Sequence, residues 1–154
     1  MMDALLGDAE VREAVRRFRP NSDATEALAR VAWSVVAEPG DGVSGALIRQ
    51  LGAADALRFA LAPDDLVTWG LDAVGEVTAR TNRTLQEGRR RWTPRADVRS
   101  VRDALRGAHE VSARLVIPGD AEWPEALDDL AEHAPLLLWA RGDARHLAAE
   151  ERYW

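Results

Sequence analysis

The sequence predicts a mainly helical protein, in which a helical domain is followed by the start of an α/β segment with two short strands. Apolar residues recur at helical spacing through most of the first hundred residues. Further along the chain, two short runs around residues 114–118 and 136–140 are continuously apolar, which is typical of buried strands. At 154 residues and 47% hydrophobic composition, the chain can bury a packed core.

The first helix expected in the helical domain covers residues 24–37. Leu28, Val31 and Val35 recur there at helical spacing, and Pro39 cannot continue the hydrogen-bond ladder beyond it. Residues 1–23 are polar and only weakly periodic. We therefore expect them to form a polar N-terminal extension that ends in a loop.

A glycine-rich turn, EPGDG at residues 38–42, separates this helix from a second short helix at 45–51. Ser44 is placed to cap the second helix and Gly52 to end it. A turn of this kind between two helices is typical of a helix-hairpin-helix, whose free amides can hold a DNA phosphate. Because Glu38 and Asp41 flank those amides, we interpret the turn as architecture rather than as a DNA contact.

Two further helices complete the predicted helical domain, which covers residues 24–92. The first covers residues 53–61, and a long helix from residue 66 to about 90 follows a proline-containing turn. On the long helix the inward face is expected to carry Leu71, Val74, Val77, Thr81 and Leu85.

The second half of the chain follows a different pattern. Residues 93–107 form a basic connector with a helix at about 96–106, and residues 108–154 begin an α/β domain. In that domain the two strands flank a short helix at 125–130, a succession that matches the start of an α/β unit. The chain then stops, so we expect this domain to be incomplete.

One basic stretch stands out in a chain whose net charge is −6. Residues 89–106 contain seven arginines and two acidic residues. A basic run beside an aromatic residue suits single-stranded nucleic acid, by phosphate pairing and base stacking. The alternative, which we favour, is that the tryptophan covers the core while the arginines neutralise a helix dipole. The candidate DNA-binding residues are Arg89, Arg90, Arg91, Trp92 and Arg95.

Nothing in the sequence indicates an enzyme, a metal site or a cofactor. Phosphate-binding loops and nucleophile elbows are missing, and no histidine has a metal-ligand partner four residues on. A catalytic carboxylate pair among the acidic residues 120–132 is the weaker interpretation of a solvated helix face. The chain has no cysteine, no signal peptide and no membrane-spanning run, so we expect a cytoplasmic protein.

An ordered series of short motifs in the second half resembles the DNA-processing protein A (DprA) family. An aromatic-proline pair is followed by a leucine, then by a proline before an apolar strand that ends in glycine. The residues in these places are Trp123, Pro124, Leu127, Pro135 and Gly142. Parts of residues 29–57 also look like the family's N-terminal region, and the resemblance covers roughly residues 25–148.

The resemblance implies a SAM-like helical domain followed by a Rossmann-like domain. It also implies single-stranded DNA and a RecA-type recombinase as partners of the full-length protein, during natural transformation. Most of the family's DNA-binding motifs would follow residue 148, so we expect this chain to be an accessory module with weak or no DNA binding of its own. The alternative is a helical protein-interaction module with no role on nucleic acid.

Overall fold

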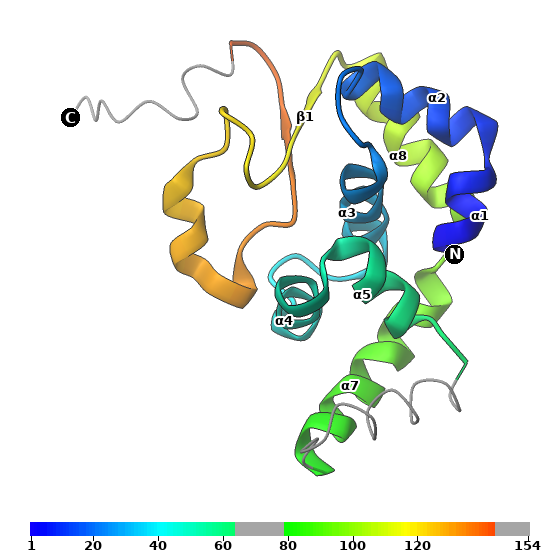
Figure 1. The fold of residues 1–154 in the computed structure, drawn as a ribbon, viewed down its shortest axis with the longest axis vertical. Coiled ribbons are helices and arrows are strands. Elements are labelled where there is room, and N and C mark those ends of the chain that lie inside the picture. The colour runs from blue at the N-terminus through cyan, green and yellow to red at the C-terminus, as the bar shows by residue number, and fades with distance from the viewer. Residues whose placement is uncertain (64–78, 144–154) are drawn as a thin grey trace.

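The computed structural model describes residues 1–63 and 79–143, and it is mainly helical with a small two-stranded antiparallel sheet (Figure 1). The helices of the first half surround α3, and the C-terminal segment lies against one side of them. The elements in chain order are α1 (Met2–Gly7), α2 (Ala9–Phe18), α3 (Thr25–Val36), α4 (Gly42–Leu51), α5 (Ala53–Ala60), α7 (Ala79–Trp92), the 3₁₀ helix η1 (Thr93–Arg95), α8 (Val98–Glu110), β1 (Arg114–Val116), the 3₁₀ helix η2 (Glu125–His133) and β2 (Leu138–Ala140).

The N-terminal segment is part of the fold, so the expected polar extension is wrong. Residues 2–18 form α1 and α2, and the side chains of Met2, Leu5, Val11 and Val15 are buried in the main core. The apolar residues repeat at intervals of three and four, but α1 and α2 are short. Asp8 separates them and caps α2 by accepting a hydrogen bond from the Val11 amide at 3.0 Å. Because of this break, the helical period is not visible when residues 1–23 are taken as one segment.

The helices expected between residues 24 and 61 are confirmed, with one changed cap. Asp41, rather than Ser44, caps α4, which begins at Gly42. Ser44 lies in the first turn, and its hydroxyl donates to the Asp41 carbonyl at 2.9 Å. Gly52 ends α4 with φ +79°, a left-handed conformation that favours glycine.

Only part of the expected long helix can be compared with the structure. Its described part is α7, where Leu85 is buried as expected and Thr81 is exposed. Residues 64–78, with the expected core positions Leu71, Val74 and Val77, lie outside the described residues.

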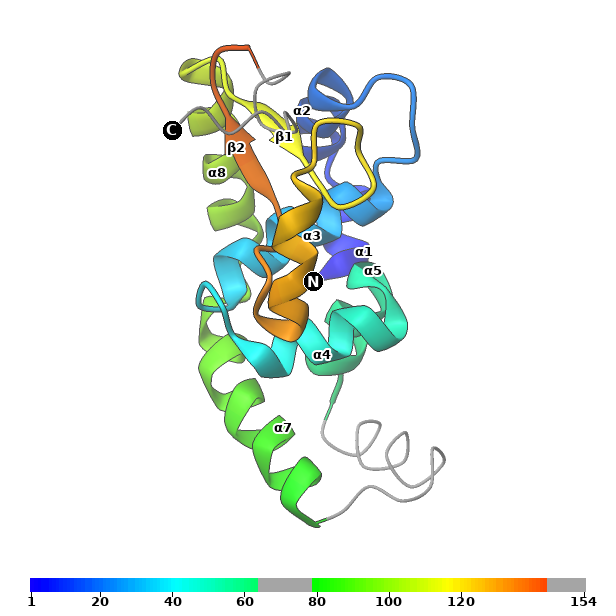
Figure 2. The same cartoon turned by 90° about the vertical axis from the view of Figure 1, so that its left-hand side faces the viewer.

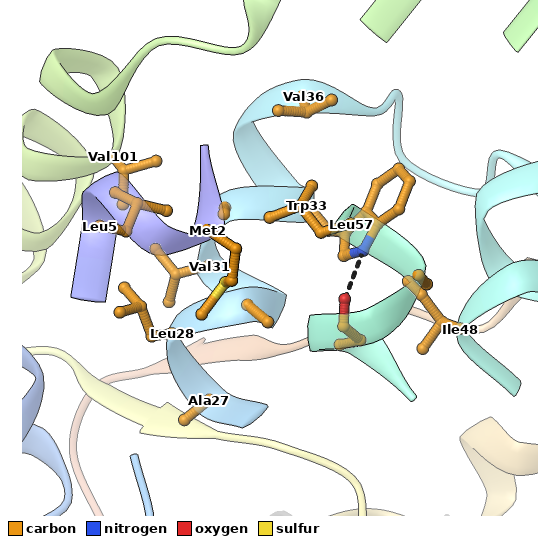
Figure 3. Close-up of a cluster of buried hydrophobic side chains, with 14 of the residues drawn as sticks. Met2, Leu5, Ala27, Leu28, Val31, Trp33, Val36, Ile48, Leu57 and Val101 are labelled. Atoms are coloured by element: carbon orange, nitrogen blue, oxygen red, sulfur yellow. Dashed lines mark hydrogen bonds between the residues drawn. The ribbon is translucent and has the colours of Figure 1, made fainter. Parts of the chain in front are cut away.

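The main hydrophobic core is built around α3 and joins segments from Met2 to Ile117. Figure 3 shows its central part, with side chains of α3 between Met2 and Leu5 on one side and Ile48 and Leu57 on the other. Trp33 is fully buried at its centre, and the indole nitrogen donates to the Ala53 carbonyl at 3.0 Å. From the expected basic connector, Val101 and Leu105 of α8 also contribute fully buried side chains. That segment is therefore a core helix as well as a link.

The two expected strands form, but they pair antiparallel, whereas a βαβ unit has parallel strands. Leu115 lies opposite Trp139 in the register, and η2 connects the strands in place of an α-helix. The Arg30 guanidinium donates to the Leu136 carbonyl at 3.0 Å, and the rings of Phe18 and Trp139 meet edge to face at 5.5 Å. These contacts attach the strand pair to α3 and to the end of α2.

The residues of the motif series have identifiable structural roles. Trp123 is buried in a small second cluster with Leu127 packed against it, and its indole nitrogen donates to Asp128 at 3.0 Å. Pro124 stands at the N-cap of η2, and Pro135 comes directly after the C-cap residue Ala134. Gly142 has φ +82°, which favours glycine just after β2.

Candidate nucleic-acid interface

The predicted DNA-binding residues lie at the C-terminal end of α7 and in η1, against the turn between α3 and α4. Asp41 of that turn connects the two segments. Its carboxylate accepts hydrogen bonds from the Trp92 indole at 3.1 Å and from Arg91 at 3.0 Å. The same carboxylate caps α4 through the amides of Val43 and Ser44, at 3.0 and 3.3 Å.

Asp41 is held as a charged group inside the protein. Its side chain is only 6% exposed, and this burial opposes ionisation. The hydrogen bonds from Arg91, Trp92, Ser44 and Val43 outweigh the burial, so the pKa of Asp41 lies below its ordinary value. The carboxylate therefore occupies the amides that a phosphate would need at this turn.

Trp92 is fully buried and offers no free face to a nucleic-acid base. Its ring packs edge to face on Trp33, with 5.1 Å between the ring centroids. A Cβ added to Gly88 would lie only 2.7 Å from the end of the Trp92 ring. The interpretation of Trp92 as a residue that covers the core is confirmed.

Most of the predicted arginines make contacts within the chain. Arg89 is 7% exposed and donates to the Ala62 carbonyl at 2.6 Å, and Arg95 forms an ion pair with Glu38. Arg91 is bound to Asp41 as described. Only Arg90 is exposed without an ion pair or hydrogen bond to a residue in 1–63 or 79–143. The basic stretch of the sequence is therefore not a free basic surface.

The other side of the turn is covered by the C-terminal segment, where η2 runs beside α4 (Figure 2). A Cβ on Gly45 would lie 1.8 Å from the Glu132 carbonyl oxygen, and one on Gly42 would lie 2.6 Å from the His133 ring. His133 Nδ1 is also 2.9 Å from the Gly40 carbonyl oxygen. Gly45 is therefore required for the close approach of the η2 backbone to α4, whereas the exposed His133 ring could move away from a side chain at position 42.

Four of the acidic residues considered for a catalytic pair each have a separate partner. Asp120 accepts two hydrogen bonds from Arg19, at 2.7 and 2.8 Å, and Asp128 accepts from Trp123. Glu122 and Glu132 pair with Arg114 and Arg49. Among the described residues no group of three or more histidine or acidic side chains could hold a metal ion.

A groove between α2 and the start of α3 is a second candidate, and the sequence did not indicate it. The groove has a volume of about 420 Å³, and Arg12, Arg16 and Arg19 lie along it. Arg12 and Arg16 are exposed and form no ion pair or hydrogen bond with the parts of the chain that the structure describes. Their spacing of four residues on one helix could have signalled a basic face, but the surrounding acidic residues obscured it.

Comparison with protein-family models, with curated proteins and with solved structures finds no match to this chain. No helix within residues 1–63 and 79–143 is both long and apolar enough to cross a membrane.

Proposed function

We propose that this chain is a module of a DprA-like protein, which handles single-stranded DNA and works with a RecA-type recombinase. The ordered motif series from Trp123 to Gly142 carries this proposal. The mainly helical first half, followed by a segment with two short strands, is compatible with it. The SAM-like and Rossmann-like folds of the two parts belong to the same proposal.

Within such a protein, the module contributes little DNA affinity through the residues 89–95. Their arginines are largely paired inside the chain, and Trp92 is buried. The net charge of −6 further opposes tight binding of a polyanion. We therefore propose an accessory role, in which DNA binding by this chain is weak.

A recombinase-assembly assay tests the proposal. A RecA-type recombinase is added to single-stranded DNA coated with single-strand-binding protein, and the lag before filament growth is measured with and without this chain. We expect the chain to shorten the lag, whereas an unrelated acidic protein of equal net charge does not. An unchanged lag, together with no binding of the chain to the recombinase by interferometry, would contradict the proposal.

The second candidate function is a protein-interaction module with no role on nucleic acid. The internal pairing of the predicted basic residues is the observation that favours it, because it removes the expected DNA surface. A pull-down in which the chain recovers a protein partner without nucleic acid, and no binding of single-stranded DNA in titration, would support this candidate over the first.

A further inference from the structure

We propose that the groove between α2 and the start of α3 binds the phosphodiester backbone of single-stranded DNA, through Arg12 and Arg16. This inference rests on the proposed function and assigns the weak DNA contact to a place in the fold. The groove lies at the start of α3, whereas the turn that contains Asp41 follows the other end of that helix. The connection between α2 and α3 loops out at the start of α3 (Figure 2).

The first argument is the separation of charge around α2. Asp8, which caps α2, pairs with Arg102 of α8 at 2.5 Å, and Glu10 pairs with Arg106 of α8 at 2.8 Å. The remaining acidic residue of α2, Glu13, pairs with Arg17 on the same helix. Arg12 and Arg16 are left without an ion-pair partner in the described residues. α2 therefore presents paired charges on the face that meets α8 and unpaired positive charges along the groove.

The second argument is geometric. Residues four apart on a helix lie on one face with their Cβ atoms about 6 Å apart, so Arg12 and Arg16 can act together on neighbouring phosphates. An arginine side chain can bind two phosphate oxygens at once, and it stays charged at every physiological pH. The groove is large enough to hold part of a nucleotide strand rather than a single ion.

The other charged groups along the groove set the strength of binding. Arg19 is neutralised by its paired hydrogen bonds to Asp120, so it shapes the groove without adding a free charge. Asp23 also lies along the groove and accepts from the Thr25 amide at 2.9 Å. Its negative charge repels a phosphate, which keeps the affinity weak.

Titration of a labelled oligothymidylate of about 12 nucleotides, at low salt, tests the site. We expect the double variant Arg12→Glu/Arg16→Glu to weaken binding at least about tenfold. The control is Arg83→Glu/Arg99→Glu, which changes the net charge equally at two exposed arginines elsewhere. It should weaken binding no more than about twofold, and circular dichroism verifies that both variants are folded.

A second variant should change the affinity for oligothymidylate in the opposite direction. Asp23→Asn keeps an acceptor for the Thr25 amide but removes the negative charge, so it should tighten binding about two- to fivefold. A merely structural role of the groove would not produce this gain. Equal losses in the two double variants, or no gain from Asp23→Asn, would overturn the inference.

The remaining outcomes separate this inference from the proposed function. Oligothymidylate binding that depends on the groove, with no effect on recombinase assembly and no binding to the recombinase, supports the site and contradicts the proposed function. A shortened recombinase lag that survives Arg12→Glu/Arg16→Glu, with unchanged oligothymidylate binding, overturns the site alone. Tighter binding of a polyglutamate peptide than of oligothymidylate would also overturn it, because the groove would then be a site for an acidic protein partner.

Discussion

The two arginine-rich regions of this protein differ in what their charges do. At residues 89–95 the sequence is densely basic, but the structure pairs Arg91 with Asp41 and Arg95 with Glu38. At α2 the sequence is mixed, yet Arg12 and Arg16 remain unpaired among the described residues, because Asp8 and Glu10 pair with α8 and Glu13 pairs with Arg17. A basic stretch therefore predicts a binding surface only when its arginines are not paired with acidic residues elsewhere in the fold.

The largest effect is expected from removing Trp92, because residues 89–95 contribute to the stability of the fold. Trp92→Ala deletes a fully buried ring that packs on Trp33, and we expect a loss of about 4 kcal/mol in the free energy of unfolding. Urea unfolding followed by circular dichroism measures it. Trp92→Phe keeps an aromatic ring and should cost about 1–2 kcal/mol, without a change in oligothymidylate affinity. A loss of that affinity at unchanged stability would show that Trp92 contacts DNA.

A similar loss is expected at the contact between α4 and η2. Gly45→Ala places a Cβ against the Glu132 backbone and should destabilise the protein by about 3 kcal/mol. Gly107→Ala is the matched control, because Gly107 lies in α8 with open space around its Cβ position. It should stabilise the protein by about 0.5–1 kcal/mol. Equal effects of the two substitutions in urea unfolding would mean that η2 does not pack closely on α4.

A smaller loss is expected when Asp41 loses its charge. Asp41→Asn removes the charged acceptor of Arg91 and Trp92 and should cost about 2 kcal/mol at neutral pH. Because the pKa of Asp41 is lowered in the folded protein, its contribution is complete above the unfolded value near 3.9 and declines as the pH falls through the folded value. The stability of the wild-type protein should therefore fall more steeply below about pH 4 than that of Asp41→Asn. Identical pH profiles would contradict this account of Asp41.

The smallest effect is expected at Arg90, the exposed member of the basic stretch. Arg90→Ala should change the free energy of unfolding by no more than about 0.5 kcal/mol, as is usual for a surface residue, because Arg90 has no partner within residues 1–63 and 79–143. It should also change the affinity for oligothymidylate by no more than about twofold relative to the wild-type protein. A larger loss of affinity would mean that residues 89–95 contact DNA, as the sequence had suggested.

Much of the fold follows from local patterns in the sequence. The apolar period of residues 24–37 and the glycines at 40 and 52 predict α3, the turn and the end of α4, because these features depend on neighbours in the chain. The role of Asp41 could not be predicted. Its partners Arg91 and Trp92 lie 50 and 51 residues away, and only the tertiary fold brings them together. The antiparallel pairing of β1 and β2 depends in the same way on the path of η2.

The salt dependence of oligothymidylate binding shows which of the two arginine-rich regions contacts the phosphates. For a single strand, the slope of log affinity against log salt is about −0.7 for each phosphate contact. Arg12→Ala/Arg16→Ala should therefore reduce the magnitude of the slope by about 1.4, while Arg90→Ala/Arg95→Ala leaves it unchanged. A reduced slope in the second variant and an unchanged slope in the first would contradict the claim that the free charges of α2, and not the paired charges of residues 89–95, contact DNA.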